Sequence, residues 1–141
     1  MAQNRFPLGR TEQKLQDRVQ ALLGEGEQVE AAVIAFTGPR AGVEVLLAPL
    51  IGLLSLFTNV CRRFTTIAIT NEGVVLLETT GLRRPVRVRA RFATLDALGP
   101  INDTVGDPWI QVDGTRYWTE GIWSPQLYVI RQLQRGTSST R

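Results

Sequence analysis

The sequence predicts a mainly β protein with helices, an α+β fold of about seven antiparallel strands with a helix near each end. Three β-branched and apolar runs succeed one another over residues 62–92, separated by turn residues. An Asp113-Gly114 dipeptide separates two further short runs, which is typical of a two-residue hairpin loop. Helical periodicity is confined to residues 12–23 and 124–134.

The N-terminal extension, residues 1–23, contains an amphipathic helix. Residues 1–10 lack periodicity, and Thr11 can serve as the N-cap of the helix. The apolar positions then recur at helical spacing on one face up to Gly24, and they are Leu15, Val19, Leu22 and Leu23. We expect this face to pack on the domain; a second copy of the chain and a membrane surface are the alternatives.

An apolar insertion, residues 41–61, interrupts the β pattern after a first strand over residues 27–36. Residues 45–60 carry no charge. A helix of this length reaches only about 24 Å, less than the roughly 30 Å of a bilayer core, and a span would divide the sheet between two compartments. The insertion is therefore expected to cover its own sheet, to contact a second subunit or to lie at a lipid interface. Its candidate contact residues are Leu46, Leu50, Ile51, Leu54 and Phe57.

Residues 64–70 and 74–79 form the first predicted hairpin, with a bulge and with Gly73 at positive φ. The third strand, residues 83–92, alternates strictly. It should place apolar side chains on the core face and Arg87, Arg89 and Arg91 in a ladder on the other.

Charge is unevenly distributed, because residues 62–91 are strongly basic and residues 96–120 are acidic, so we expect an electrically two-sided molecule. The candidate contacts to an anion or an acidic lipid are Arg62, Arg63, Arg83, Arg84, Arg87, Arg89 and Arg91. Solvation, or pairing with Glu72 or Glu78, is the alternative. Nucleic acid is an unfavoured partner, because no aromatic residue interleaves these arginines.

Residues 94–98 could form a short strand, and residues 101–107 a loop. The two-residue loop then predicts a hairpin register in which Trp109 faces Trp118. These tryptophans are either covered by a neighbouring element or exposed as a partner surface. The last helix should begin with Ser124 as its cap and bury one apolar face against an open end of the sheet. Residues 136–141 read as a disordered tail.

Several chemistries lack their usual residues. The chain has no histidine, and its single cysteine, Cys61, can form no internal disulfide and fits a reducing compartment. No phosphate-binding loop or nucleophile–base pair is evident, so we expect no enzyme activity, no cofactor, no metal and no small-molecule substrate. The absence of a secretory signal favours a cytoplasmic location.

Three stretches carry a resemblance to a known family: residues 26–29, residues 66–76 and residues 124–134. Their order resembles the bacterial pleckstrin-homology-like domains, in particular an actinobacterial branch, over residues 24–135. The resemblance implies a partly open barrel closed at one corner by the last helix. In eukaryotic relatives the first loop holds phosphoinositide head groups with basic residues, whereas here it offers only Arg40 before the apolar run.

Two functional hypotheses result. The first is a non-catalytic interaction module that self-associates or binds a protein through the insertion and the Trp109/Trp118 face. The second is a peripheral adaptor at the inner face of the membrane that binds acidic lipid through residues 83–91.

Overall fold

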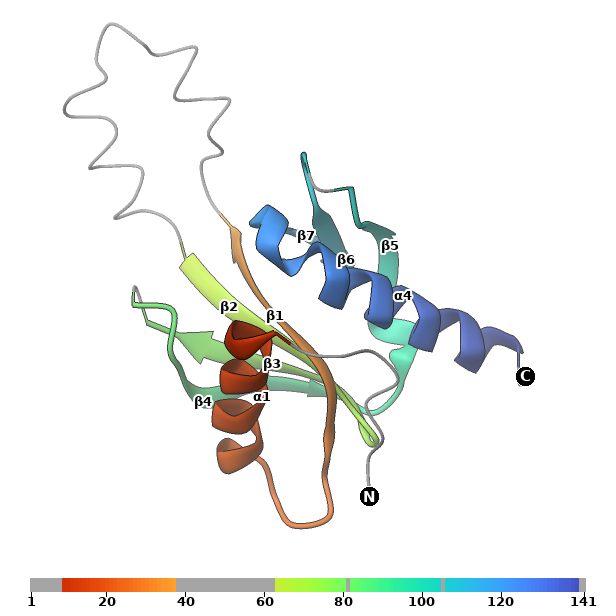
Figure 1. The fold of residues 1–141 in the computed structure, drawn as a ribbon. Coiled ribbons are helices and arrows are strands. Elements are labelled where there is room, and N and C mark those ends of the chain that lie inside the picture. The colour runs from red at the N-terminus through yellow and green to blue at the C-terminus, as the bar shows by residue number, and fades with distance from the viewer. Residues whose placement is uncertain (1–8, 38–62, 81, 105, 140–141) are drawn as a thin grey trace, which may run out of the picture.

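A computed structural model describes residues 9–37, 63–80, 82–104 and 106–139 (Figure 1). The elements are α1 (Arg10–Leu22), β1 (Val29–Thr37), β2 (Arg63–Thr70), β3 (Gly73–Thr79), β4 (Pro85–Phe92), η2 (Leu95–Ala97), β5 (Leu98–Asn102), β6 (Trp109–Val112), β7 (Thr115–Thr119), η3 (Gly121–Trp123) and α4 (Ser124–Ser139). The strands form one open antiparallel sheet in the order β4-β3-β2-β1-β7-β6-β5. The predicted α+β, mainly β class is confirmed.

The hairpin of β2 and β3 is regular. Thr70 pairs with Gly73 and the register runs without a shift, so the predicted bulge is wrong. Gly73 does adopt the predicted positive φ, of 131°. A Cβ at this position would lie 2.0 Å from the backbone oxygen of Phe92, which only glycine avoids.

Exposure along β4 alternates as predicted from Arg87 to Phe92, but Val86, expected on the core face, is 44% exposed, and the predicted single ladder of arginines is wrong. Two register shifts interrupt the pairing of β4 with β3, one between Leu76 and Leu77 and one between Glu78 and Thr79. Arg87 consequently pairs with Glu78, and Arg91 pairs with Val75. Since residues 75 and 78 are an odd number of positions apart on a regular strand, Arg87 and Arg91 lie on opposite faces. The arginines therefore do not form one ladder.

The chain after β4 also departs from expectation. Where a strand was expected over residues 94–98, the 3-10 turn η2 begins after Thr94, whose side chain accepts a hydrogen bond from the backbone N–H of Asp96. The strand instead comes after this turn, as β5, and includes Gly99 and Pro100. As the last strand of the order, β5 lies at an edge of the sheet, where a proline is tolerated.

The β6–β7 hairpin matches its prediction at every pair, including Trp109 with Trp118. Asp113 and Gly114 both have positive φ, 49° and 82°, as a type I′ turn requires.

The helix α1 packs on the sheet, as expected, with Leu15 and Val19 buried. It begins one residue before Thr11, with Gly9 at the N-cap, so the predicted Thr11 cap is wrong.

The helix α4 buries Leu127 and Ile130. It comes directly after η3, so Ser124 already has helical backbone angles and is not the predicted N-cap. Its buried hydroxyl has no hydrogen-bond partner among the described residues. The helix continues to Ser139, within the stretch predicted to be a disordered tail.

Both faces of the sheet centre are covered. Consecutive residues of β1 and of β3 are buried, which requires cover on both sides. Figure 1 shows α1 in front of the β1–β3 part and α4 in front of the β5–β7 part, and both helices contact β1. They also meet each other, because Gln16 donates a hydrogen bond of 3.2 Å to the buried Oε1 of Gln126.

Within the described residues, no helix is long and apolar enough to cross a membrane. The apolar insertion, with Leu46, Leu50, Ile51, Leu54 and Phe57, lies outside those residues. So do Cys61 and Arg62.

Candidate interaction surface

Four aromatic side chains form a continuous row across the sheet. Phe36 on β1 is the direct cross-strand partner of Phe64 on β2 and of Trp118 on β7. Trp118 in turn opposes Trp109 on β6. Because directly opposed residues point to the same face, these four rings share one face of four neighbouring strands. We call these residues the aromatic row.

All four rings of the row are half-buried, so each presents part of its surface to solvent. The rings of Phe36 and Phe64 pack edge to face, with centroids 6.4 Å apart and planes at 67°. The residues next to them, such as Ala35 and Ile110, point to the opposite face and are fully buried. The row is thus fixed in place by the core beneath it.

A guanidinium group stands over the ring at each end of the row. Arg116 lies 3.9 Å from the centre of the Trp109 ring, and Arg83 lies 5.6 Å from the centre of the Phe64 ring. Both distances are within the range of a cation–π contact. Arg83 also forms an ion pair with Glu120. The row therefore has a guanidinium group at each end, and the one at the Phe64 end is already paired with a carboxylate.

Exposed apolar side chains lie near the Arg83 end. Leu82, which directly precedes Arg83, is 92% exposed, and Ile122, two residues after Glu120, is 50% exposed. Val86 on β4 is 44% exposed. Single exposed apolar side chains are common on protein surfaces, so Leu82 alone does not define a binding patch.

The predicted basic site is largely engaged within the molecule. Arg87 pairs with Glu78 across the β3–β4 ladder, which is the alternative to an anion site that the sequence analysis gave. Arg89 donates a 3.3 Å hydrogen bond to the hydroxyl of Tyr117. Arg84 makes no ion pair with the described residues. The structure describes the backbone of Arg63 but not its side chain. Arg83 of the basic segment pairs with Glu120 of the acidic segment, so the two segments meet at this point.

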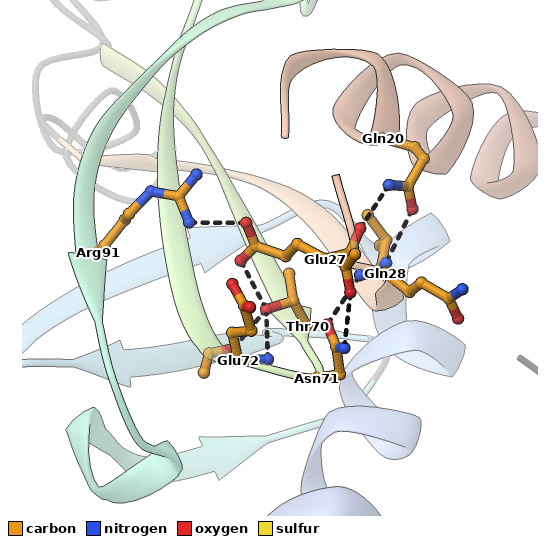
Figure 2. A network of polar contacts seen from close by, with 10 residues as sticks. Gln20, Glu27, Gln28, Thr70, Asn71, Glu72 and Arg91 are labelled. Carbon is orange, nitrogen blue, oxygen red and sulfur yellow. Dashed lines mark hydrogen bonds and ion pairs between the residues drawn. The ribbon is translucent and has the colours of Figure 1, made fainter. Parts of the chain in front are cut away.

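Arg91 belongs to a polar network around Glu27, a residue only 3% exposed (Figure 2). The carboxylate of Glu27 accepts from Arg91 at 2.7 Å and from the Thr70 hydroxyl at 2.9 Å. Nearby, Gln20 donates to the backbone oxygen of Glu27 at 2.6 Å, and Asn71 donates to that of Gly26 at 3.0 Å. The network ties the loop after α1 to the β2–β3 turn and to β4. The network has a structural role, because the Glu27 carboxylate and the Arg91 guanidinium bind each other and are not available to a ligand.

A shallow hollow of about 560 Å³ lies beside this network, lined by residues of the loop between α1 and β1. It contains both Glu25 and Glu27, but Glu27 is already paired. The described residues hold no group of three or more His, Cys, Asp or Glu side chains placed to bind a metal ion.

Sequence reasoning found Trp109 and Trp118 but missed Phe36, Phe64 and Arg116. The tryptophan pair is predicted by a local loop of two residues. The two phenylalanines flank residues 38–62, and their pairing with each other and with Trp118 brings together distant parts of the chain. The only signal in the sequence was that a bulky aromatic residue stands on each side of the insertion.

Comparison with known proteins gave no match of any kind. No family model, no curated protein and no solved structure matches the chain.

Proposed function

We propose that the chain is a non-catalytic interaction module of the pleckstrin-homology-like type, and that it binds a protein partner through the aromatic row. The observation that carries this proposal is the row itself, in which Phe64, Phe36, Trp118 and Trp109 occupy directly opposed positions on four strands. Aromatic residues and arginine are the types most enriched at the energetic centres of protein interfaces. Arg83 and Arg116 accompany the rings here.

Site-specific photocrosslinking in cells tests this proposal. A photoreactive amino acid replaces Ile122, which is exposed near the row, or Leu22, which is 36% exposed on α1. We expect a discrete protein adduct from position 122 and none from position 22. Equal labelling from both positions, or no adduct from position 122, would contradict the proposal. Light scattering of the purified chain then determines whether the partner is a second copy.

Peripheral binding to an acidic membrane is a second candidate function, at the inner face of the membrane. One observation favours membrane binding: Leu82 is almost fully exposed and directly precedes two arginines. Of these two, Arg84 forms no ion pair with the described residues. An exposed apolar residue beside basic residues suits the boundary of an anionic bilayer.

Co-sedimentation with phosphatidylserine vesicles tests the membrane hypothesis. Binding should fall with added salt and in the Arg84→Glu variant, and it should persist in Lys14→Glu, which makes the same charge change on α1. Binding that is equal in the two variants, or absent from the wild type, would remove this candidate.

A further inference from the structure

We propose that α1 is a displaceable cover, and that the surface beneath it is a docking groove for an amphipathic helix of a partner protein. This surface lies at the other end of β1 from Phe36 and the aromatic row, so it is a second interaction site that does not depend on the proposed function. Four features lead to it: the position of α1, its weak attachment, the hinge that follows it and the hydrogen-bonding groups that it covers.

The helix α1 lies along the first half of β1. Its middle meets the strand at Ala32, where the side-chain oxygen of Gln126 accepts from Gln16 at 3.2 Å and from the backbone N–H of Ala32 at 3.3 Å. Its last turn meets the strand at Val29, whose backbone N–H donates to Gln20 at 3.1 Å. The helix also contacts β4. We call the surface beneath α1, formed by residues 29–32 of β1, by β4 and by Gln126, the α1 groove.

The attachment of α1 is weak. Of its 13 residues, three have buried side chains, and these are Leu15, Val19 and the polar Gln16. No side chain caps its first turn, and its last turn has no basic residue. Among the described residues, no ion pair joins α1 to another element. Because a helix of this length is marginal on its own, α1 belongs to the parts of the fold that open most readily.

The chain between α1 and β1 provides a hinge. An added Cβ at Gly24 or Gly26 would meet no atom within 4 Å, and the hollow of about 560 Å³ lies beside this loop. Directly after the hinge, the Glu27 carboxylate is held by Arg91 and Thr70. Motion of α1 is therefore confined to residues 23–26, and the sheet stays intact when the helix leaves.

The groups that α1 covers define the ligand that can replace it. Without α1, the Gln126 side chain loses Gln16, while the backbone N–H of Val29 and the backbone oxygen of Glu27 lose Gln20. Polar groups of this kind are costly to bury without partners, so a ligand must supply two amide side chains four residues apart. In α1 each glutamine directly follows a buried apolar residue. The groove therefore selects a helix in which an apolar–Gln pair recurs after four residues.

A second copy of the chain is a poorer occupant than a partner helix. Exchange of α1 between two copies remakes the same contacts and gains none. A partner helix with a wider apolar face or a stronger intrinsic helix propensity gains free energy when it displaces α1.

Fluorescence anisotropy with a labelled peptide of residues 9–23 tests the inference on the 141-residue chain. We expect the peptide to bind, because it presents the side chains that the α1 groove accepts. A control peptide with Gln16→Glu and Gln20→Glu keeps the apolar face but loses the amide donors, and it should bind about tenfold more weakly or less. Both comparisons use the wild-type chain, so they do not depend on the folding of any variant.

Two substitutions in the chain itself separate displacement of α1 from binding elsewhere. Val19→Ala removes a fully buried contact of α1, so the open fraction rises and the peptide should bind about tenfold more tightly. Leu22→Ala changes a residue of the same helix that is 36% exposed, and it should leave the affinity within about twofold. Thermal unfolding verifies that both variants are folded.

Hydrogen exchange of the wild-type chain gives an independent measurement. Amide hydrogens of α1 should exchange about tenfold faster, or more, than those of β2 and β3. Equal protection of these elements would overturn the inference.

Absence of binding at millimolar peptide, equal binding of the glutamate peptide, or a Val19→Ala chain that binds no more tightly than Leu22→Ala would each also overturn it. A dimer in light scattering that the peptide converts to monomers would replace the partner helix by α1 of a second copy. Photocrosslinking from position 122 reports on the aromatic row alone, so failure of that proposal is distinguishable from failure of this one.

Discussion

Replacement of Arg91 by alanine should destabilise the fold, although Arg91 is half-exposed on an edge strand. Its guanidinium is one of two groups that bind the carboxylate of Glu27, which is almost fully buried. The Arg91→Ala variant leaves that carboxylate with the Thr70 hydroxyl as its remaining side-chain partner. A buried charge without its counter-ion is costly, because the protein interior solvates it poorly.

The structure sets the size of the effect. Breaking a fully buried ion pair by removing one partner costs about 3–5 kcal/mol. The Arg91 side chain is 46% exposed, so water reaches part of the site, and Thr70 retains its hydrogen bond. We therefore expect a loss of about 2 kcal/mol from the free energy of unfolding. Arg87→Ala, which breaks the exposed pair with Glu78, should cost no more than about 0.5 kcal/mol.

Urea denaturation monitored by tryptophan fluorescence measures both variants. With a slope of about 2 kcal/mol per molar urea for a chain of this size, Arg91→Ala should lower the midpoint by about 1 M. Glu27→Gln combined with Arg91→Ala should cost less than the sum of the two single changes, because the double variant buries no unpaired charge. A midpoint for Arg91→Ala no lower than that of Arg87→Ala would refute this reasoning.

The remaining predictions concern backbone crowding, a buried amide and the core. Gly73→Ala should cost more than about 3 kcal/mol in a urea titration, because its Cβ would meet the Phe92 backbone, while Gly106→Ala, which meets no atom within 4 Å, should cost less than about 1 kcal/mol. Gln126→Met should cost about 2 kcal/mol, since its oxygen accepts from Gln16 and from the backbone N–H of Ala32. Leu127→Ala should lower the unfolding free energy by about 3 kcal/mol, with thermal denaturation as the check.

The sequence was most informative where structure is decided locally. Two loop residues with positive φ are enough to fix the β6–β7 register, and every pair in that hairpin was predicted. The apolar stripe of α1 likewise predicted the burial of Leu15 and Val19, although Leu22 of the same stripe is 36% exposed. In each case the deciding residues are neighbours in the chain.

Other features depend on partners that are distant in the chain, and these could not be predicted. The period-2 pattern of β4 gave no sign of its two register shifts, which appear only against β3. For the same reason the binding of Arg91 to Glu27, 64 residues earlier, was not foreseen. The N-cap assigned to Ser124 failed for a local reason instead, because η3 directly precedes α4 and brings the chain into it already helical.

The ion pair between Arg91 and the buried Glu27 changes how a lipid-binding experiment on β4 should be designed. Charge reversal of Arg87, Arg89 and Arg91 together would place a new carboxylate beside Glu27 and damage the fold. Loss of vesicle binding in that variant would therefore say little about lipid. Arg84→Glu alone is the informative change, since Arg84 has no ion pair with the described residues.

The two halves of the sheet meet at a short ladder. The strands β1 and β7 join the two halves, and among the described residues their ladder has two pairs, Ala35 with Thr119 and Phe36 with Trp118. The second of these pairs belongs to the aromatic row, so a ligand lying along the rings would bridge the two halves. Such a ligand would stabilise the contact between the two halves of the sheet. Amide hydrogens on both sides of the β1–β7 ladder would then exchange more slowly while the ligand is bound.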